Sequence, residues 1–385
     1  MDRAKVLSNS RRIVVKIGSR VITSSKNELD LSLIESLVKE IETLYKKNHQ
    51  IIIVTSGAIV AGLKDLKLGS RPTDLPLKQA ASAIGQVKLM HSYSTAFKRY
   101  NIPVAQILLT REDLQNRHRY LNARNTLLRL LGKGVIPIIN ENDTVAVEEI
   151  KFGETKFGDN DTLSALVSLM MDADLLTILT SVEGLYTDLP DKNWQAGIPK
   201  NKKIKFVPYV AEITPAIEKM AKRKGDGAGG METKIKAAKM LTQSGIPVII
   251  ANGIEKQILN KIIKGKEIGT FFAPLEQKKK GKKKWIAFSL KSKGQIVVDK
   301  GAKEALLKGG KSLLPSGMVS VKGNFDSGDS VSITDENGKE FARGLSNYSS
   351  DEIEKIKGLK SSEIKKALRY KDYDEVIHRD NLVVM

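Results

Sequence analysis

The stretch Arg12-Ile13-Val14-Val15-Lys16-Ile17-Gly18-Ser19 decides the fold class of this chain. Its apolar part is one of several short runs rich in Val, Ile and Leu, as expected for strands buried on both faces of a parallel sheet. These runs are Arg12–Ile17, Gln50–Thr55, Ile102–Leu109, Val135–Ile139, Leu175–Leu179 and Ile246–Ile250. Longer amphipathic stretches lie between them and predict helices at Leu31–Lys47, Leu77–Tyr100, Leu121–Leu131, Thr162–Met171 and Glu232–Ser244.

This alternation predicts an α/β domain over residues 1–277, with a mostly parallel sheet between two layers of helices. Ligands of such sheets bind beyond the carboxyl ends of the strands, so functional residues are expected there. A lysine-rich run at 278–284 then acts as a linker. Residues 285–370 carry short strand patterns with Gly, Asp and Asn turns, which predict a small β-rich, barrel-like domain, followed by a tail at 371–385.

Composition excludes several classes of protein. The chain has no cysteine, which excludes a disulfide scaffold, thiolate catalysis and cysteine-ligated metal clusters, and favours a cytoplasmic location. We find no signal peptide and no apolar run that could span a membrane, so no membrane role is expected. The formal net charge is +20, yet residues 285–385 hold 17 basic and 15 acidic residues, so the second domain is nearly neutral.

Polar residues follow the predicted strands. Lys16 interrupts an apolar strand just before Gly18, where its ammonium group could reach a bound phosphate. Thr55 and Ser56 end the next strand and suit either an anion site or an ordinary helix cap. The run Asn140-Glu141-Asn142-Asp143 makes a poor core and a good ligand site.

Two further segments open predicted helices. Gly158-Asp159-Asn160-Asp161 holds more carboxylate and amide groups than a helix cap requires, and suits an ammonium group or a water-mediated Mg²⁺ contact. The run Gly225–Lys234 leaves backbone amides free to surround phosphate oxygens, and Lys234 adds a positive charge. A plain flexible loop is the alternative interpretation of the second segment.

Taken in order, these motifs resemble the glutamate-phosphorylating kinases of the amino acid kinase family, and Gly184-Leu185-Tyr186 adds to the resemblance. The second domain is similar to the PUA domain, an RNA-binding type of module, through Ser312–Gly317 and Gly323–Asp329. The resemblance implies a three-layer αβα sandwich with a C-terminal PUA barrel. It also implies transfer of the ATP γ-phosphoryl group to the side-chain carboxylate of L-glutamate, the first step of proline biosynthesis.

The resemblance also assigns roles. Lys16 and Lys234 would neutralise the phosphates and Asp161 would orient both lysines. Glutamate would bind Ser56, Asp143 and Asn160, with Asp143 accepting from the ammonium group while the other two donate to carboxylate oxygens. ATP would contact Lys16, Thr180, Ser181, Ala228, Gly229, Gly230, Met231, Glu232, Thr233 and Lys234. No protein ligand is expected for Mg²⁺, which nucleotide phosphates and water would hold.

Three positions depart from the family pattern, which has Asp at Ser181, Thr at Ala228 and a small hydroxyl residue at Glu232. The resemblance further implies feedback inhibition by L-proline and a homo-oligomer, either a tetramer or a dimer. Two alternatives stay open. One is a related kinase acting on aspartate, acetylglutamate, carbamate or a nucleoside monophosphate, and the other is an RNA-binding protein, which the near-neutral second domain disfavours.

Overall fold

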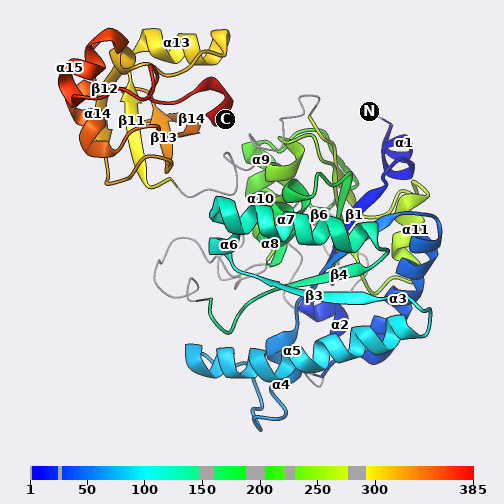
Figure 1. Cartoon of the computed structure of the whole chain (residues 1–385). Helices are drawn as coiled ribbons and strands as arrows, with labels where there is room; N and C mark the ends of the chain where they lie inside the picture. Colours follow the sequence, from blue (N-terminus) through cyan, green and yellow to red (C-terminus); the bar gives the residue numbers. More distant parts are fainter. Residues whose placement is uncertain (1, 25–27, 147–159, 188–203, 222–229, 276–291) are drawn as a thin grey trace. The chain divides into compact units, whose positions relative to one another are not determined.

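Figure 1 shows the computed structural model of the chain, which divides into two compact units, Met1–Lys278 and Lys279–Met385. The structure describes all residues except 1, 25–27, 147–159, 188–203, 222–229 and 276–291. The lysine-rich run at 278–284, which we expect to be a linker, therefore lies outside the described residues. Each unit is treated by itself below.

The first unit is built on an eight-stranded sheet with the order β3-β4-β2-β1-β5-β9-β10-β8. Six of its strands run parallel, whereas β10 pairs antiparallel with β9 and β8 pairs parallel with β10, so these two strands run in the opposite direction. The strands of the sheet are β1 Arg12–Ile17, β2 Gln50–Val54, β3 Val104–Leu109, β4 Ile136–Glu141, β5 Leu175–Thr180, β8 Tyr209–Val210, β9 Val248–Asn252 and β10 Thr270–Phe272, and β6 Leu185–Tyr186 pairs separately with β7 Phe206–Val207. Strand β1 lies between β2 and β5, so the chain leaves β1 in one direction and later returns on its other side. Such a reversal opens a crevice at the carboxyl ends of these strands.

Helices cover both faces of this sheet (Figure 1). One layer contains α7, α8 and α10, which contact β4, β1 and β9 respectively, and the opposite layer contains α2, α3 and α5, which contact β5, β2 and β3. The helices of the first unit are α1 Arg3–Ser8, α2 Ser19–Ile22, α3 Leu31–Lys46, α4 Ala58–Gly62, α5 Leu75–Lys98, α6 Arg111–Gln115, α7 Arg117–Gly132, α8 Asn160–Met170, α9 Pro215–Ala221, α10 Met231–Thr242 and α11 Ile258–Ile263. The expected αβα sandwich is confirmed.

Sequence signals explain where the main helices begin. Asp30 and Asp74 accept hydrogen bonds from the third backbone amide of α3 and α5, as N-cap residues do. Helix α4 then packs directly on α5, because a Cβ atom on Gly62 or Gly85 would lie only 2.0 Å or 1.8 Å from a backbone oxygen of the other helix. This close contact brings the side chains of α5 toward the ends of β2 and β4.

The second unit is β-rich, as expected, and contains a five-stranded sheet with the order β12-β11-β13-β14-β15. Its elements are β11 Gly294–Val298, α13 Lys300–Gly309, β12 Met318–Lys322, β13 Ser330–Thr334, β14 Glu340–Leu345, α14 Ser350–Ile356, α15 Ile364–Leu368 and β15 Leu382–Val384. Strand β15 pairs antiparallel with β14, so residues 371–385, which the sequence analysis separates as a tail, contribute to this sheet. A core of its own includes Ile296, Ile333, Tyr348 and Ile377.

Candidate active site

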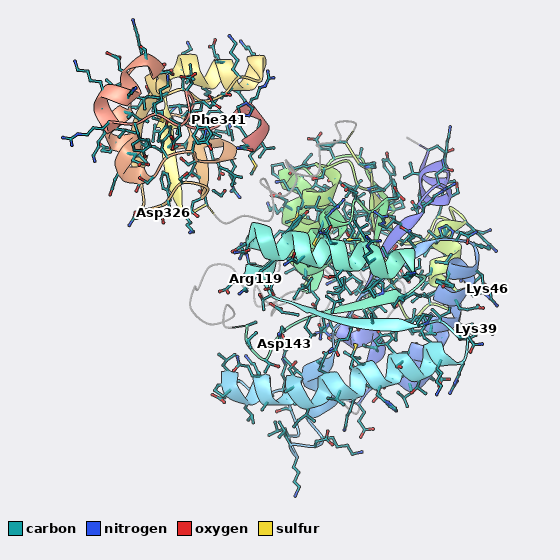
Figure 2. All side chains as sticks on the ribbon, viewed as in Figure 1. Lys39, Lys46, Arg119, Asp143, Asp326 and Phe341 are labelled. Carbon is teal, nitrogen blue, oxygen red and sulfur yellow. The ribbon has the colours of Figure 1, made fainter. Side chains whose placement is uncertain are left out.

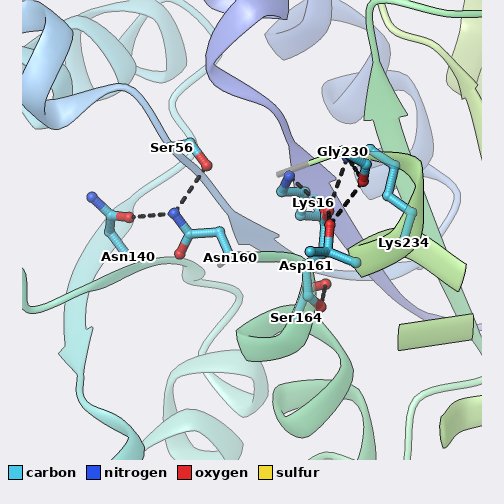
Figure 3. Close-up of polar contacts among 9 residues, drawn as sticks. Lys16, Ser56, Asn140, Asn160, Asp161, Ser164, Gly230 and Lys234 are labelled. Carbon is cyan, nitrogen blue, oxygen red and sulfur yellow. Dashed lines mark hydrogen bonds and ion pairs between the residues drawn. The ribbon is translucent and has the colours of Figure 1, made fainter. Parts of the chain in front are cut away.

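Side chains from three elements meet at the carboxyl end of β1 (Figure 3). Lys16 lies on β1, Asp161 lies in the first turn of α8, and Lys234 lies near the start of α10. Asp161 is fully buried, and the two lysine side chains are each only 6% exposed. Three charged residues buried together inside a layered fold indicate a site built for charge chemistry.

The Asp161 carboxylate joins the two lysines. Its Oδ1 lies 2.5 Å from Lys16 Nζ and its Oδ2 lies 2.9 Å from Lys234 Nζ. The Thr233 hydroxyl, 2.8 Å away, also donates to Oδ2. Each carboxylate oxygen therefore receives an ammonium group, and the two ammonium groups are held at opposite ends of one anion. We call these three residues, Lys16, Asp161 and Lys234, the charged cluster.

The charged cluster carries one net positive charge, because it combines two ammonium groups with one ionised carboxylate. Burial by itself would raise the pKa of Asp161, but the charges and hydrogen bonds of Lys16 and Lys234 outweigh it and hold that pKa below its ordinary value. Asp161 thus stays ionised at neutral pH. An arrangement of this kind neutralises an anion such as a phosphate chain while keeping both lysines in fixed positions.

Next to the charged cluster lies a chain of uncharged amides (Figure 3). Asn160 Nδ2 donates to Ser56 Oγ over 2.9 Å and to Asn140 Oδ1 over 3.1 Å. Asn140 Nδ2 in turn donates to Gln86 Oε1 over 2.9 Å. We call Gln86, Asn140 and Asn160 the amide chain. It links the ends of β2 and β4 with the start of α8 and with the middle of α5.

Asp143 lies on the segment that follows β4, close to α5 (Figure 2). Its Oδ2 accepts a hydrogen bond of 2.7 Å from the Ser82 hydroxyl of α5. Ser82 precedes Gln86 by one helical turn, so one face of α5 supports both Asp143 and the amide chain. The carboxylate of Asp143 is suited to accept from an ammonium group of a ligand.

Two neighbouring features, a buried tyrosine of α5 and a glycine with positive φ, stabilise the turn that carries Ser56. The Tyr93 hydroxyl, fully buried on α5, lies 3.0 Å from Thr55 Oγ1, and burial raises the pKa of Tyr93 so that it stays protonated. Gly57 follows with φ of 105°, a left-handed conformation that side-chain-bearing residues avoid. These features hold Ser56 at the end of β2 without using its own side chain.

The predicted nucleotide residues are only partly described. Gly230 is the N-cap of α10, Met231, Glu232 and Thr233 form its first turn, and Thr180 and Ser181 lie at the end of β5. The Glu232 side chain forms an exposed ion pair with Lys236, 2.9 Å away. Ala228 and Gly229 lie outside the described residues, as do Gly158 and Asp159. The structure thus places Gly230–Lys234 beside Lys16 and Asp161.

Sequence reasoning missed the contribution of α5. Ser82, Gln86 and Tyr93 contact the site from a helix that we expected only to cover the sheet. Asn140 belongs to the motif Asn140–Asp143, in which the sequence analysis assigns a role to Asp143 alone. A usable signal existed, because Ser82 and Gln86 are polar residues one turn apart on the buried side of a helix, beside the small residues Ala81 and Gly85.

The acidic side chains in the described part of the site do not form a metal centre. Among the residues that the structure describes, no group of three or more Asp, Glu, His or Cys side chains could hold a metal ion. Both oxygens of Asp161 are engaged by lysines.

Comparison with known proteins gives consistent matches. The model of the amino acid kinase family matches residues 11–252, and that of the PUA domain matches residues 294–368. A glutamate 5-kinase of Moorella thermoacetica is 49% identical over 381 residues, covering 98% of this chain and 97% of the relative. A glutamate 5-kinase of Caldanaerobacter subterraneus subsp. tengcongensis is 50% identical over 376 residues, covering 97% of this chain and 98% of the relative.

A helix that spans a membrane must be long and predominantly apolar. In the described part of the chain, none is long and apolar enough to cross a bilayer.

Proposed function

The chain belongs to the amino acid kinase family, and we propose that it transfers the γ-phosphoryl group of ATP to the side-chain carboxylate of L-glutamate. The products are L-glutamyl 5-phosphate and ADP, and the reaction is the first step of proline biosynthesis. The observation that carries this proposal is the position of the charged cluster directly beside the amide chain, joined through the consecutive residues Asn160 and Asp161.

The reaction needs no nucleophile from the protein. A carboxylate oxygen of glutamate forms a bond to the γ-phosphorus, while the bond from that phosphorus to the β–γ bridging oxygen breaks and its electrons leave with ADP. Catalysis of such a transfer consists of alignment and of charge stabilisation. Lys16 and Lys234 stabilise the negative charge on the transferring group and the leaving oxygen, and Asp161 keeps the two ammonium groups apart and in place.

Mg²⁺ fits this site as a companion of ATP, with nucleotide phosphates and water as its ligands. When bound, it neutralises part of the phosphate charge. Asp161 is not suited to hold it, because both carboxylate oxygens already contact ammonium groups. The backbone amides at the start of α10 and the residues Thr180 and Ser181 are proposed to hold the nucleotide itself. The departures at Ser181, Ala228 and Glu232 would act on nucleotide preference rather than on the reaction.

The amino acid is proposed to bind Ser56, Asp143 and Asn160. Asp143 supplies the negative charge for the ammonium group, and the Ser82 hydroxyl of α5 helps to hold its carboxylate in place. Ser56 ends β2 beside the amide chain, where its hydroxyl can reach a carboxylate oxygen. This arrangement orients glutamate with its side-chain carboxylate toward the charged cluster and its ammonium group toward α5.

Finer properties follow from the same proposal. We expect L-proline to inhibit the reaction, the chain to form a homo-oligomer, either a tetramer or a dimer, and the location to be cytoplasmic. The second unit is proposed to have a structural or regulatory role. RNA binding is not favoured, because 17 basic and 15 acidic residues after position 284 leave little charge to neutralise a phosphate backbone.

The test is ATP-dependent formation of an acyl phosphate, trapped with hydroxylamine as a hydroxamate. L-glutamate, N-acetylglutamate and L-aspartate are compared in parallel, with and without Mg²⁺ and L-proline. Mg²⁺-dependent product from L-glutamate alone is expected, with less product when L-proline is added. Product from N-acetylglutamate or L-aspartate in preference to L-glutamate, or no product from any of the three, would overturn the proposed substrate.

A further inference from the structure

The amide chain has a direction. Each amide donates from its nitrogen to the next residue, from Asn160 to Asn140 and from Asn140 to Gln86. An amide that turned over alone would bring two oxygens or two nitrogens face to face. The chain therefore has two consistent arrangements, the observed one and one in which all three amides are reversed.

The two directions present different groups to a ligand. In the observed direction the amide nitrogen of Asn160 donates one hydrogen to Ser56 and the other to Asn140. Its buried Oδ1 has no hydrogen-bond partner among the described residues. Ser56 Oγ accepts, so its own hydroxyl hydrogen is left to donate. In the reversed direction, Ser56 would donate that hydrogen to Asn160, and Asn160 would present N–H groups instead of an acceptor.

The observed direction matches the two charged ends of an amino acid. The Ser56 hydroxyl donates to a carboxylate oxygen, and Asn160 Oδ1 accepts from an ammonium group. This gives Asn160 the opposite role from the carboxylate donor expected from the sequence.

Gln86 stands at the far end of the amide chain and is 9% exposed. Its Oε1 accepts from Asn140, while its buried Nε2 has no partner among the residues that the structure describes. Ser82, one turn earlier on α5, holds the Asp143 carboxylate. A negative charge on that face favours the amide orientation in which Gln86 keeps its N–H groups on the side of Asp143 and turns its oxygen to Asn140.

We propose that Gln86 is a positioning and specificity-determining residue, whose side-chain oxygen sets the direction of the amide chain and so the groups that meet the amino-acid substrate. The inference rests on the proposed function, because it names the ammonium and carboxylate groups of an amino acid as the recognised chemistry. Gln86 acts through Asn140 and Asn160 and contacts no reacting atom in this proposal.

Two substitutions of Gln86 separate its effect on the hydrogen-bond direction of the amide chain from its effect on packing. Gln86→Glu keeps an acceptor for Asn140 and removes the N–H groups, so it fixes the observed direction. Gln86→Met keeps a similar volume and removes both polar groups, so it leaves the direction unset. The hydroxamate assay is run on the full-length chain with L-glutamate and with glutarate, which lacks the amino group, and KM is measured for each and for ATP.

Gln86→Met is expected to raise the KM for L-glutamate about tenfold or more and to lower the preference for L-glutamate over glutarate, while the KM for ATP stays within about twofold. Gln86→Glu keeps the acceptor for Asn140 and is therefore expected to retain the preference for L-glutamate over glutarate, while the second carboxylate on the side of Asp143 changes the KM values for both substrates. Thermal unfolding midpoints accompany both variants, and Gln86→Met should change the midpoint little, because the acceptor lost by Asn140 Nδ2 is offset by removal of the unpaired Gln86 Nε2.

An equal loss of the preference for L-glutamate in the two variants, or an unchanged L-glutamate KM in Gln86→Met, would overturn the role of Gln86 while leaving the kinase assignment intact. An earlier unfolding midpoint for Gln86→Met with KM values for L-glutamate and ATP raised together would reduce Gln86 to a structural residue. A parent chain that gives no hydroxamate from L-glutamate would instead remove the proposed function, and the inference with it.

Discussion

The charged cluster and the amide chain form two halves of the site, and different interactions hold each half together. The charged cluster is held by ion pairs around Asp161, whereas the amide chain is held by hydrogen bonds between neutral groups. They meet at the consecutive residues Asn160 and Asp161 in the first turn of α8. One helix start therefore serves both halves.

The difference follows from what each half has to bind. Phosphate groups carry several charges that shift during transfer, and buried ammonium groups stabilise such charge over a range of positions. An amino acid carries an ammonium and carboxylates in fixed relative positions, which directed donors and acceptors distinguish. Charge thus suits the reacting phosphoryl group, and direction suits the choice of substrate.

The largest effect is expected at the residue that holds the charged cluster together. Asp161→Asn leaves two buried ammonium groups without an anion and should lower the free energy of unfolding by about 3–5 kcal/mol at neutral pH. Urea denaturation of the two chains measures the change. A loss below about 1 kcal/mol, as for a surface pair, would mean that the charged cluster is not electrostatically coupled.

The same pair of proteins tests the sign of the pH dependence. Because the folded-state pKa of Asp161 is lowered, its ionised form stabilises the fold above the unfolded value of about 3.9, and that contribution is lost as pH falls through the folded pKa. The difference in unfolding free energy between the parent chain and Asp161→Asn should therefore be constant from neutral pH down to about pH 4 and shrink in stronger acid. A difference that grows on acidification would contradict the assigned shift.

At Lys234, which pairs with Asp161 in the charged cluster, we expect a lower catalytic rate without loss of the fold. Lys234→Met should lower kcat about 100-fold to 1000-fold, since it removes one of two buried cations that face the transferring group. Lys236→Met is the matched control on the same helix, because its side chain is 62% exposed and should leave kcat within about twofold. Similar kcat values for the two variants would contradict the role of Lys234 in stabilising charge on the transferring phosphoryl group.

In the half of the site proposed to bind the amino acid, Asp143→Asn keeps an acceptor for the Ser82 hydroxyl and removes the negative charge. The KM for L-glutamate should rise about tenfold to 100-fold, because a charged hydrogen bond to the ammonium group is lost. The KM for glutarate should not rise, and steady-state kinetics with both substrates measures the contrast. An equal rise for both substrates would mean that Asp143 does not face the ammonium group.

The smallest effect is expected at Tyr93, a buried residue of α5 that contacts the turn carrying Ser56. Tyr93→Phe removes the hydroxyl that contacts Thr55 and should cost about 1 kcal/mol of stability, with little change in either KM. Thermal or urea unfolding detects this loss. A large rise in the L-glutamate KM would show that the Ser56 turn depends on this buried contact more than the geometry indicates.

Sequence reasoning recovered the fold because its strong signals are local. The run Arg12–Ile17 is strand β1 with the expected bounds, and the pattern at Leu31–Lys47 became α3. Lys16 could be singled out because it interrupts an apolar strand, and Lys234 because it follows a glycine-rich run. The short strands β8, β10 and β15 were missed, since two or three residues carry too little periodicity.

The amide chain could not be derived from the sequence. Its contacts depend on how far α5 slides along the sheet, and that position is set by the direct packing of Gly62 and Gly85 rather than by any periodic pattern. Gln86 and Asn140 are 54 positions apart, and only the folded chain brings their side chains together. For the same reason, the direction of the hydrogen bonds, which decides what Asn160 presents, has no trace in the sequence.

The most direct test of this account measures equilibrium binding of each ligand to two variants. Titration calorimetry with L-glutamate and with a non-hydrolysable ATP analogue plus Mg²⁺ is performed on Lys234→Met and on Asn140→Leu, which interrupts the amide chain. We predict that Lys234→Met weakens the nucleotide about tenfold or more and leaves L-glutamate within about twofold, and that Asn140→Leu does the reverse. Equal weakening of both ligands by both variants would contradict the division of the site into a charged half for phosphate and a directional half for the amino acid.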